Sequence, residues 1–139
     1  MADLVITASN VARGTGATSS LLLNAAVGIT AGQLLYADTS VNPNVWRLAS
    51  ATTSATTGQI NAVALANAAA GQPVLGLTLG VYTVGATLVA GQVYVLSANA
   101  GNIAPVSDLA TGWYTTILGI AISTTQLQMG PVNSGIVHA

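Results

Sequence analysis

Charged side chains are nearly absent from this 139-residue chain, which contains two Arg and three Asp but neither Lys nor Glu. Charged residues make up 4% of the sequence, against about 25% in ordinary globular domains. Two Arg cannot form the basic surface that a phosphate backbone requires, so we expect no nucleic-acid partner. A net charge of −1 also gives little repulsion between molecules in solution. We therefore expect protein to cover much of this surface in an assembly.

The residues that carry most enzyme chemistry are also scarce. Cysteine is absent, which excludes disulfides and thiolate chemistry. The single histidine, His138, stands one residue before the end of the sequence, and the three Asp are scattered, so no triad, carboxylate pair or metal cluster is apparent. The stretch "RGTGATSS" lacks the Lys of a phosphate-binding loop. We expect no enzymatic activity, no catalytic or metal-binding residues, no cofactor and no small-molecule substrate.

One uncharged stretch, residues 73–91, approaches the length of a membrane-spanning helix. It contains Pro73, four Gly and three Thr, and no basic residue flanks it. Aliphatic residues occupy every second position from Leu75 to Val81, and a period of two indicates a strand. The sequence therefore predicts a buried hairpin here and no membrane partner. The N-terminal sequence also lacks the basic start and apolar run of a signal peptide.

Short apolar and β-branched runs between turn-forming residues dominate the rest of the chain. Turns spaced by about 8–12 residues predict an all-β fold, a small antiparallel barrel or sandwich, formed as a single domain by residues 21–139. The Ala-rich stretch 62–70 could instead form a helix, but it shows no helical stripe and we favour a strand. The predicted strands are Leu4–Ala8, Leu21–Val27, Gln33–Ala37, Val45–Ala49, Ile60–Ala66, Val74–Leu79, Val81–Val84, Val93–Ser97, Tyr114–Ser123 and Gln126–Met129.

The tripeptide Ala-Gly-Gln occurs three times, at 31–33, 70–72 and 90–92, each time directly before an apolar run. Glycine supplies a backbone conformation that other residues reach only with strain, so the chain can reverse direction there. We expect each copy to mark the start of a strand. Because the copies share no wider similarity, they do not indicate a solenoid repeat.

Two polar segments differ from the apolar runs. Residues 9–20, "SNVARGTGATSS", are small and polar, and with the preceding apolar residues they predict an extended N-terminal arm over residues 1–20. The alternative is that Leu4–Ala8 forms the first strand of the domain itself. Residues 50–59, "SATTSATTGQ", predict an exposed loop. The arm residues expected to bind a partner are Asp3, Leu4, Val5, Ile6, Thr7 and Arg13.

The large aromatic residues are few enough to consider individually. Trp46 stands in "NVWRLAS", and Trp113 and Tyr114 follow Gly112. Each can face either a core or a neighbouring subunit, because a large aromatic side chain stabilises both kinds of contact. We expect these three residues to contribute to a subunit interface.

A series of turns and strands in the second half of the chain is the most specific pattern in the sequence. It consists of "AAGQPV", "TLVAGQVYVLSANAGNIAP", "DLATGWY" and "ILGIAIS". Residues 64–129, which contain this series, resemble the small head-decoration, or capsid cement, proteins of tailed bacteriophages. The earlier "ITAGQLLYAD" and "VWRLASA" are similar to a hairpin of the same family. The resemblance covers about two thirds of the chain.

This resemblance implies a tulip-like β domain that forms a homotrimer on the outer surface of the virion capsid, after synthesis in the cytoplasm of the bacterial host. The implied partner is the major capsid protein, whose neighbouring subunits the trimer clamps and stabilises. The N-terminal arm is expected to add a strand to the capsid sheet. The near absence of charge, the Thr/Ser loop and the tail "GPVNSGIVHA" depart from the family pattern. The alternative function is a β-rich fibre or adhesion module that binds a glycan or a host receptor.

Overall fold

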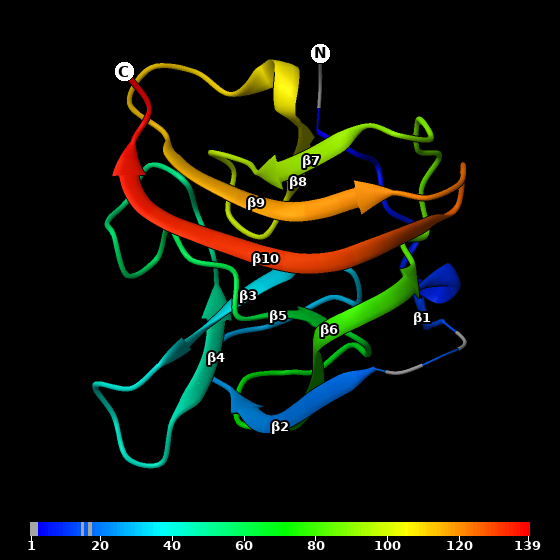
Figure 1. Cartoon of the computed structure of the whole chain (residues 1–139). Helices are drawn as coiled ribbons and strands as arrows, with labels where there is room; N and C mark the ends of the chain where they lie inside the picture. Colours follow the sequence, from blue (N-terminus) through cyan, green and yellow to red (C-terminus); the bar gives the residue numbers. More distant parts are fainter. Residues whose placement is uncertain (1–2, 15, 17) are drawn as a thin grey trace.

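The computed structural model describes residues 3–14, 16 and 18–139, and it confirms the expected all-β class. Strands and loops make up this part of the chain, together with two short 3-10 turns, η1 (Ala8–Asn10) and η2 (Val106–Asp108) (Figure 1). The strands are β1 (Ala12–Arg13), β2 (Ser19–Ala25), β3 (Leu34–Asp38), β4 (Val45–Leu48), β5 (Ala62–Ala64), β6 (Pro73–Thr83), β7 (Val93–Leu96), β8 (Ile103–Pro105), β9 (Tyr114–Ala121) and β10 (Gln126–Val137).

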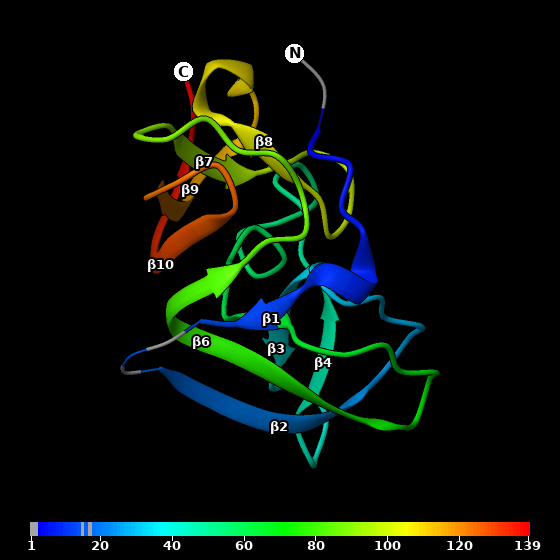
Figure 2. The ribbon, with the colours of Figure 1, turned by 90° about the vertical axis from the view of Figure 1, so that its right-hand side faces the viewer.

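Strand β6 joins the two halves of the fold (Figures 1 and 2). Its first part pairs with β2 and β5, and the pairings β2–β4, β4–β3 and β3–β5 close these five strands into a ring. Its last residues pair with β1 and with β10, and β10 leads through β9 and β7 to β8 as an open sheet. Because β2 and β4 run parallel, the fold is a mixed, sandwich-like arrangement and not a clean antiparallel barrel.

Trp46 on β4 belongs to a core inside the ring of strands. Its side chain is fully buried, and the indole Nε1 donates a hydrogen bond to the carbonyl of Val74 at 3.2 Å. Gly76 on β6 leaves room for this ring, since a Cβ there would lie 2.7 Å from Ala62 Cβ and 3.0 Å from the indole. Trp46 is therefore a core residue. The expectation that it contributes to a subunit interface is wrong, because its side chain has no exposed surface.

A second, larger core lies between the ring and the open sheet. Leu34 and Leu77 enter it from ring strands, and Leu118 and Leu127 enter it from β9 and β10; all four are fully buried. Burying such a side chain contributes about 1.5–3 kcal/mol. This shared core holds the two halves together as one unit.

Each Ala-Gly-Gln tripeptide forms the same tight turn before a strand. Gly32, Gly71 and Gly91 have φ of 93, 88 and 84°, and the following Gln N–H donates to the carbonyl three residues earlier at 3.0–3.1 Å. Both features are typical of a type II turn, whose third position favours Gly. The turns precede β3, β6 and β7, which confirms the prediction. Asn99–Asn102 and Ala110–Trp113 form equivalent turns before β8 and β9.

Several predicted elements differ from those observed. Residues 73–91 do not form a hairpin, because β6 continues to Thr83 and all its partner strands lie outside this stretch. The strand prediction is confirmed at 62–64. The alternative of a helix over 62–70 is wrong, because the residues between Ala64 and Gly71 form bends and a turn. Strand β10 extends to Val137, well beyond the predicted Met129. The sequence analysis also missed the short strands β1 and β8.

The Thr/Ser stretch 50–59 is a turn-rich loop with an exposed tip and a buried base. At the base, the Ser50 hydroxyl donates to the Ala98 carbonyl at 2.9 Å, and the buried Thr116 hydroxyl donates to the Gly58 carbonyl. The Asn133 side chain accepts from the Ile60 N–H at 2.8 Å and donates to the Ile60 carbonyl at 3.2 Å. The loop is thus anchored to both β9 and β10, and only its tip fits the predicted exposure.

Candidate interaction surfaces

The N-terminal segment, residues 3–7, lies on its own domain. The Leu4 N–H donates to the Ile103 carbonyl at 2.9 Å, and the Thr7 N–H donates to the Gly85 carbonyl at 2.8 Å. Leu4 and Ile6 pack against the larger core, whereas Val5 is 89% exposed. The segment packs along its own domain and forms no β-strand, so the alternative that Leu4–Ala8 is the first strand of the domain is wrong. That the segment binds a partner stays a prediction. The gain from burying two aliphatic side chains on the domain explains this placement.

Asp3 fixes the beginning of this segment through three side-chain hydrogen bonds. Its carboxylate accepts from the Ser97 hydroxyl at 2.7 Å and from the side-chain amides of Asn99 at 2.8 Å and Asn102 at 3.1 Å. Partial burial raises the pKa of Asp3, but the hydrogen bonds from Asn99, Ser97 and Asn102 outweigh it, and the pKa lies below its usual value. The charged carboxylate is therefore the form that holds the segment.

The remaining part of the predicted arm is also structured where it is described. Arg13 lies in β1 opposite Tyr82, and its guanidinium Nη2 donates to the Ser20 hydroxyl at 3.0 Å. Strand β2 begins at Ser19, inside the segment that the sequence assigned to the arm. Residues 1, 2, 15 and 17 of the predicted arm lie outside the described residues. Of the expected arm residues, Val5, Thr7 and Arg13 are exposed.

Trp113 and Tyr114 are both half-buried, unlike Trp46. Trp113 packs against the larger core from the turn before β9. Tyr114 begins β9, and its N–H donates to the Ala51 carbonyl at 2.7 Å, beside the base of the 50–59 loop. The structure leaves part of each ring on the surface. Their expected place in a subunit interface stays a prediction.

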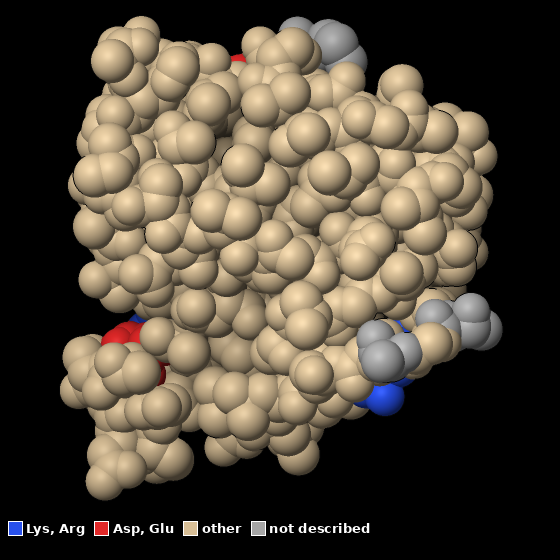
Figure 3. Space-filling view, in the orientation of Figure 1, with Lys and Arg blue, Asp and Glu red and all other residues tan. Residues whose placement is uncertain are grey.

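Two of the charged side chains, on the neighbouring strands β3 and β4, form an ion pair. Arg47 Nε lies 2.6 Å from Asp38 Oδ2 on the neighbouring strand. Hydrogen bonds from the Ser40 hydroxyl and from Arg47 lower the pKa of Asp38 to about 2. In Figure 3 the coloured side chains occupy the margins of the molecule, and the broad face in the centre is uncharged.

This uncharged face, on the outer side of β9 and β10, carries exposed aliphatic side chains that we call the apolar face. Leu79, Ile120 and Val132 are 52, 49 and 55% exposed. They line a groove of about 410 Å³ together with Val93 and Ile117. Monomeric proteins rarely expose contiguous apolar patches, and those that do commonly use them to bind. The sequence analysis missed these residues, because on β9 the exposed Ile120 and the buried Leu118 are both aliphatic and the sequence does not distinguish them.

One edge of β10 continues the apolar face. Strand β6 pairs with β10 only from Gln126 to Met129, whereas β9 pairs with it as far as Val137. From residue 130 onward the other edge of β10 has no strand partner within the described residues. The Asn133 side chain occupies one point of it by binding Ile60. An open edge beside apolar side chains favours pairing with another chain.

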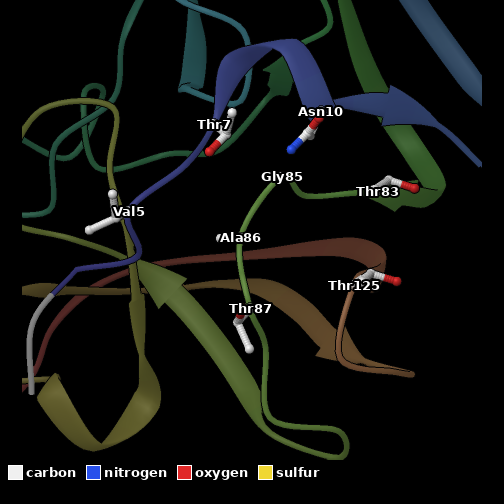
Figure 4. A pocket seen from close by; sticks show the side chains of 8 residues that line it. All are labelled: Val5, Thr7, Asn10, Thr83, Gly85, Ala86, Thr87 and Thr125. Atoms are coloured by element: carbon white, nitrogen blue, oxygen red, sulfur yellow. The ribbon is translucent and has the colours of Figure 1, made fainter.

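A polar hollow of about 560 Å³ lies between the N-terminal segment and the loop after β6 (Figure 4). Thr83 and Thr125 stand on one side of it, and Val5 stands on the other. Its polar side chains are those of Thr7, Asn10, Thr83, Thr87 and Thr125. None of the residues that line it is ionisable or aromatic. This hollow therefore provides neither a proton-transfer group nor a ring on which a ligand could stack.

Within the described ranges, no group of three or more His, Asp, Glu or Cys side chains is placed to hold a metal ion. None of the helical segments in that part of the chain is long and apolar enough to span a bilayer. Comparison of the sequence and structure with protein-family models, curated proteins and solved structures found no match.

Proposed function

We propose that this protein is a structural virion protein that decorates the outside of a tailed-bacteriophage head and stabilises it by clamping neighbouring major capsid subunits. The observation that carries the proposal is the apolar face with its adjoining open strand edge. A surface of this kind is stabilised when another protein covers it. The choice of a capsid as partner is supported by the resemblance of residues 64–129 to head-decoration proteins.

The scarcity of charge supports a permanent assembly over a transient encounter. Transient partners commonly use complementary charges to steer association, and this chain has five charged residues, two of which pair with each other. Instead of complementary charges, the apolar face offers aliphatic contacts and the open edge of β10 offers main-chain pairing. We propose a homotrimer as the assembled form, with the half-buried Trp113 and Tyr114 near the subunit contacts and the apolar face toward the capsid.

The test is co-sedimentation with expanded heads that lack the protein, prepared from the phage that carries its gene. The wild-type protein should sediment with the heads and light scattering should report a trimer. Val132→Asp places a charge on the apolar face and should weaken head binding at least tenfold, since the carboxylate would lose its water on docking. Val41→Asp is the matched control because Val41 is 40% exposed and lies between β3 and β4.

The outcomes separate the two parts of the proposal. A wild-type protein that fails to bind heads contradicts the decoration function. Binding that survives Val132→Asp as well as it survives Val41→Asp contradicts the role of the apolar face. A protein that stays monomeric both in solution and on heads contradicts the trimer.

A further inference from the structure

Two strands of the fold, β2 and β10, are exposed on both faces. Successive residues of a strand point to opposite faces of the sheet, so a run of exposed residues means that neither face is covered. Residues 19–22 of β2 and residues 132–137 of β10 form such runs. No other described strand has more than two exposed residues in a row. A partner resting on one face would leave the other bare, so a neighbour at the strand edge covers them best.

Strand β2 has an open edge where its exposed residues lie. On one side it pairs with β6 from Ser19 to Asn24. On the other side it meets β4 only through Asn24 and Ala25. Residues 19–23, which we call the β2 edge, therefore have no strand partner on that side within the described part of the chain. Figure 2 shows β2 at the lower side of the molecule, beside β6.

Strand β10 has the matching open edge at its end. Beyond Met129 it pairs with β9 alone, as far as Val137. We call residues 133–137 the β10 edge. The last strand of the open sheet, β8, differs from these two edges, because the N-terminal segment lies along it and the Leu4 N–H donates to the Ile103 carbonyl. The fold thus covers one edge with its own chain and leaves the β2 and β10 edges open.

The two open edges have the same chemistry. Each carries two consecutive exposed aliphatic residues, Leu21 and Leu22 on the β2 edge and Ile136 and Val137 on the β10 edge. Neither strand contains a charged residue, although natural proteins commonly place charges on an edge to prevent pairing. A Cβ at Gly135 would meet no heavy atom within 4 Å, so the surface beside Ile136 is open to a large side chain.

We propose that a second copy of this chain covers these edges, so that the β2 edge of one copy pairs with the β10 edge of the next in a closed ring. Two unlike surfaces that meet head to tail generate a ring, whereas one surface that meets itself generates a dimer. Main-chain hydrogen bonds and aliphatic pairs on both faces stabilise such a contact. This inference deepens the proposed homotrimer, on which it rests for the number of copies.

The properties of each edge favour this occupant over another protein. A strand that covers the β2 edge without burying an unpaired charge must be uncharged and must carry aliphatic side chains on both faces. The β10 edge has both properties, and every copy of the chain supplies it. Tyr114 lies opposite Val137 on β9, so the pairing also brings Tyr114 close to the neighbouring copy. The apolar face is left to the capsid.

Light scattering of the full chain, without capsids, tests the pairing. Leu22→Asp blocks the β2 edge and Ile136→Asp blocks the β10 edge, because each carboxylate would lose its water in the contact. Each variant alone should have the mass of one copy at a concentration where the wild type is trimeric. Val41→Asp is the matched control, since Val41 is 40% exposed and lies between β3 and β4, and it should remain trimeric.

A mixture of the two variants distinguishes unlike edges from like ones. The intact β10 edge of Leu22→Asp should pair with the intact β2 edge of Ile136→Asp, so an equimolar mixture should have the mass of two copies. Circular dichroism checks that each variant is folded. Leu22→Ser and Ile136→Ser replace an aspartate variant that does not fold, and each should raise the dissociation constant at least tenfold.

The outcomes separate this inference from the proposed function. The inference is overturned, while the trimer stands, if folded Leu22→Asp or Ile136→Asp remains trimeric. Dimers of either variant alone, a mixture that stays at the mass of one copy, or wild-type filaments also overturn it. A wild type that stays monomeric contradicts both this inference and the trimer. Co-sedimentation with heads then decides the decoration function separately.

Discussion

Three glycines in equivalent turns allow the docking of the N-terminal segment to be measured. Gly32, Gly71 and Gly91 each occupy the third position of a type II turn with φ between 84 and 93°. A Cβ added at Gly71 or Gly91 would meet no heavy atom within 4 Å, whereas at Gly32 it would lie 2.7 Å from Ile6 Cγ2 and 3.1 Å from Val11 Cγ2. Alanine therefore introduces the same backbone strain at all three positions and a steric clash at one.

The cost of the backbone strain and the cost of the steric clash can be measured separately. An alanine in the left-handed region costs about 1–2 kcal/mol, so Gly71→Ala and Gly91→Ala should each lower the free energy of unfolding by that amount. Relieving the clash at Gly32 requires Ile6 to move from its packed position, and overpacking of this kind costs about 1–3 kcal/mol. Gly32→Ala should therefore cost about 2–5 kcal/mol in total.

Urea unfolding followed by tryptophan emission gives the required free energies. Ile6→Ala removes the atoms that clash, so the double variant with Gly32→Ala should cost less than the two single variants together, by at least about 1 kcal/mol. Gly71→Ala with Ile6→Ala should show no such coupling, because Gly71 is not in contact with Ile6. If Gly32→Ala costs no more than Gly91→Ala, the N-terminal segment does not dock at this turn and the free-arm interpretation returns.

Acid unfolding and two buried hydroxyls provide further tests. The Ser40 hydroxyl and Arg47 lower the pKa of Asp38 from 3.8 to about 2. The contribution of Asp38 to stability is therefore present above the unfolded-state pKa and is lost as the pH falls from about 4 to about 2. Asp38→Asn should flatten this part of the pH profile of stability measured by urea unfolding. The buried Thr116 hydroxyl donates to a main-chain carbonyl, so Thr116→Val should cost about 1–3 kcal/mol. The Tyr82 hydroxyl is buried without a partner among the described residues, so Tyr82→Phe should be neutral or stabilising, and a large loss of stability in calorimetry would contradict this.

The sequence predicted the strands of the middle of the chain because their limits are set locally. Gly at the third position of each Ala-Gly-Gln turn requires no information from distant residues, and β3, β6 and β7 begin directly after these turns. The pairing of strands depends on distant contacts. The hairpin expected at 73–91 failed for this reason, since β6 has partners from four other parts of the chain.

The two tryptophans show that the sequence does not predict which aromatic residues reach the interaction surfaces. Each is a large aromatic residue at or next to the start of a predicted strand, so the sequence analysis treated them alike. Trp46 is buried because Gly76, Ala62 and Val74, all distant in sequence, form a space of its size. Trp113 is half-buried because the neighbouring turn brings it to the edge of the larger core. This difference depends on the closure of the ring of strands, which no local pattern encodes.

The N-terminal segment is misjudged for a related reason. The apolar run Leu4–Ile6 is too short to predict a stable strand, and the polar stretch that follows it resembles a linker. What holds the segment is a set of contacts across almost a hundred residues, from Asp3 to Asn99 and Asn102. Single carboxylates are usually interpreted as turn residues, so the sequence gives no signal that Asp3 is an anchor.

Asn side chains take over roles that charged residues have in most domains. Asn61 and Asn67 accept the backbone N–H groups of Ala37 and Ala31 at 2.9 and 2.8 Å, and Asn133 binds both backbone groups of a residue before β5. An amide both donates and accepts, so it satisfies backbone groups without the cost of desolvating a charge. Because charged residues are so few, the outer side of β9 and β10 has no like-charge repulsion that would oppose association. The near absence of charge and the apolar face are therefore two aspects of a single property, a surface that another protein can cover without desolvating ions.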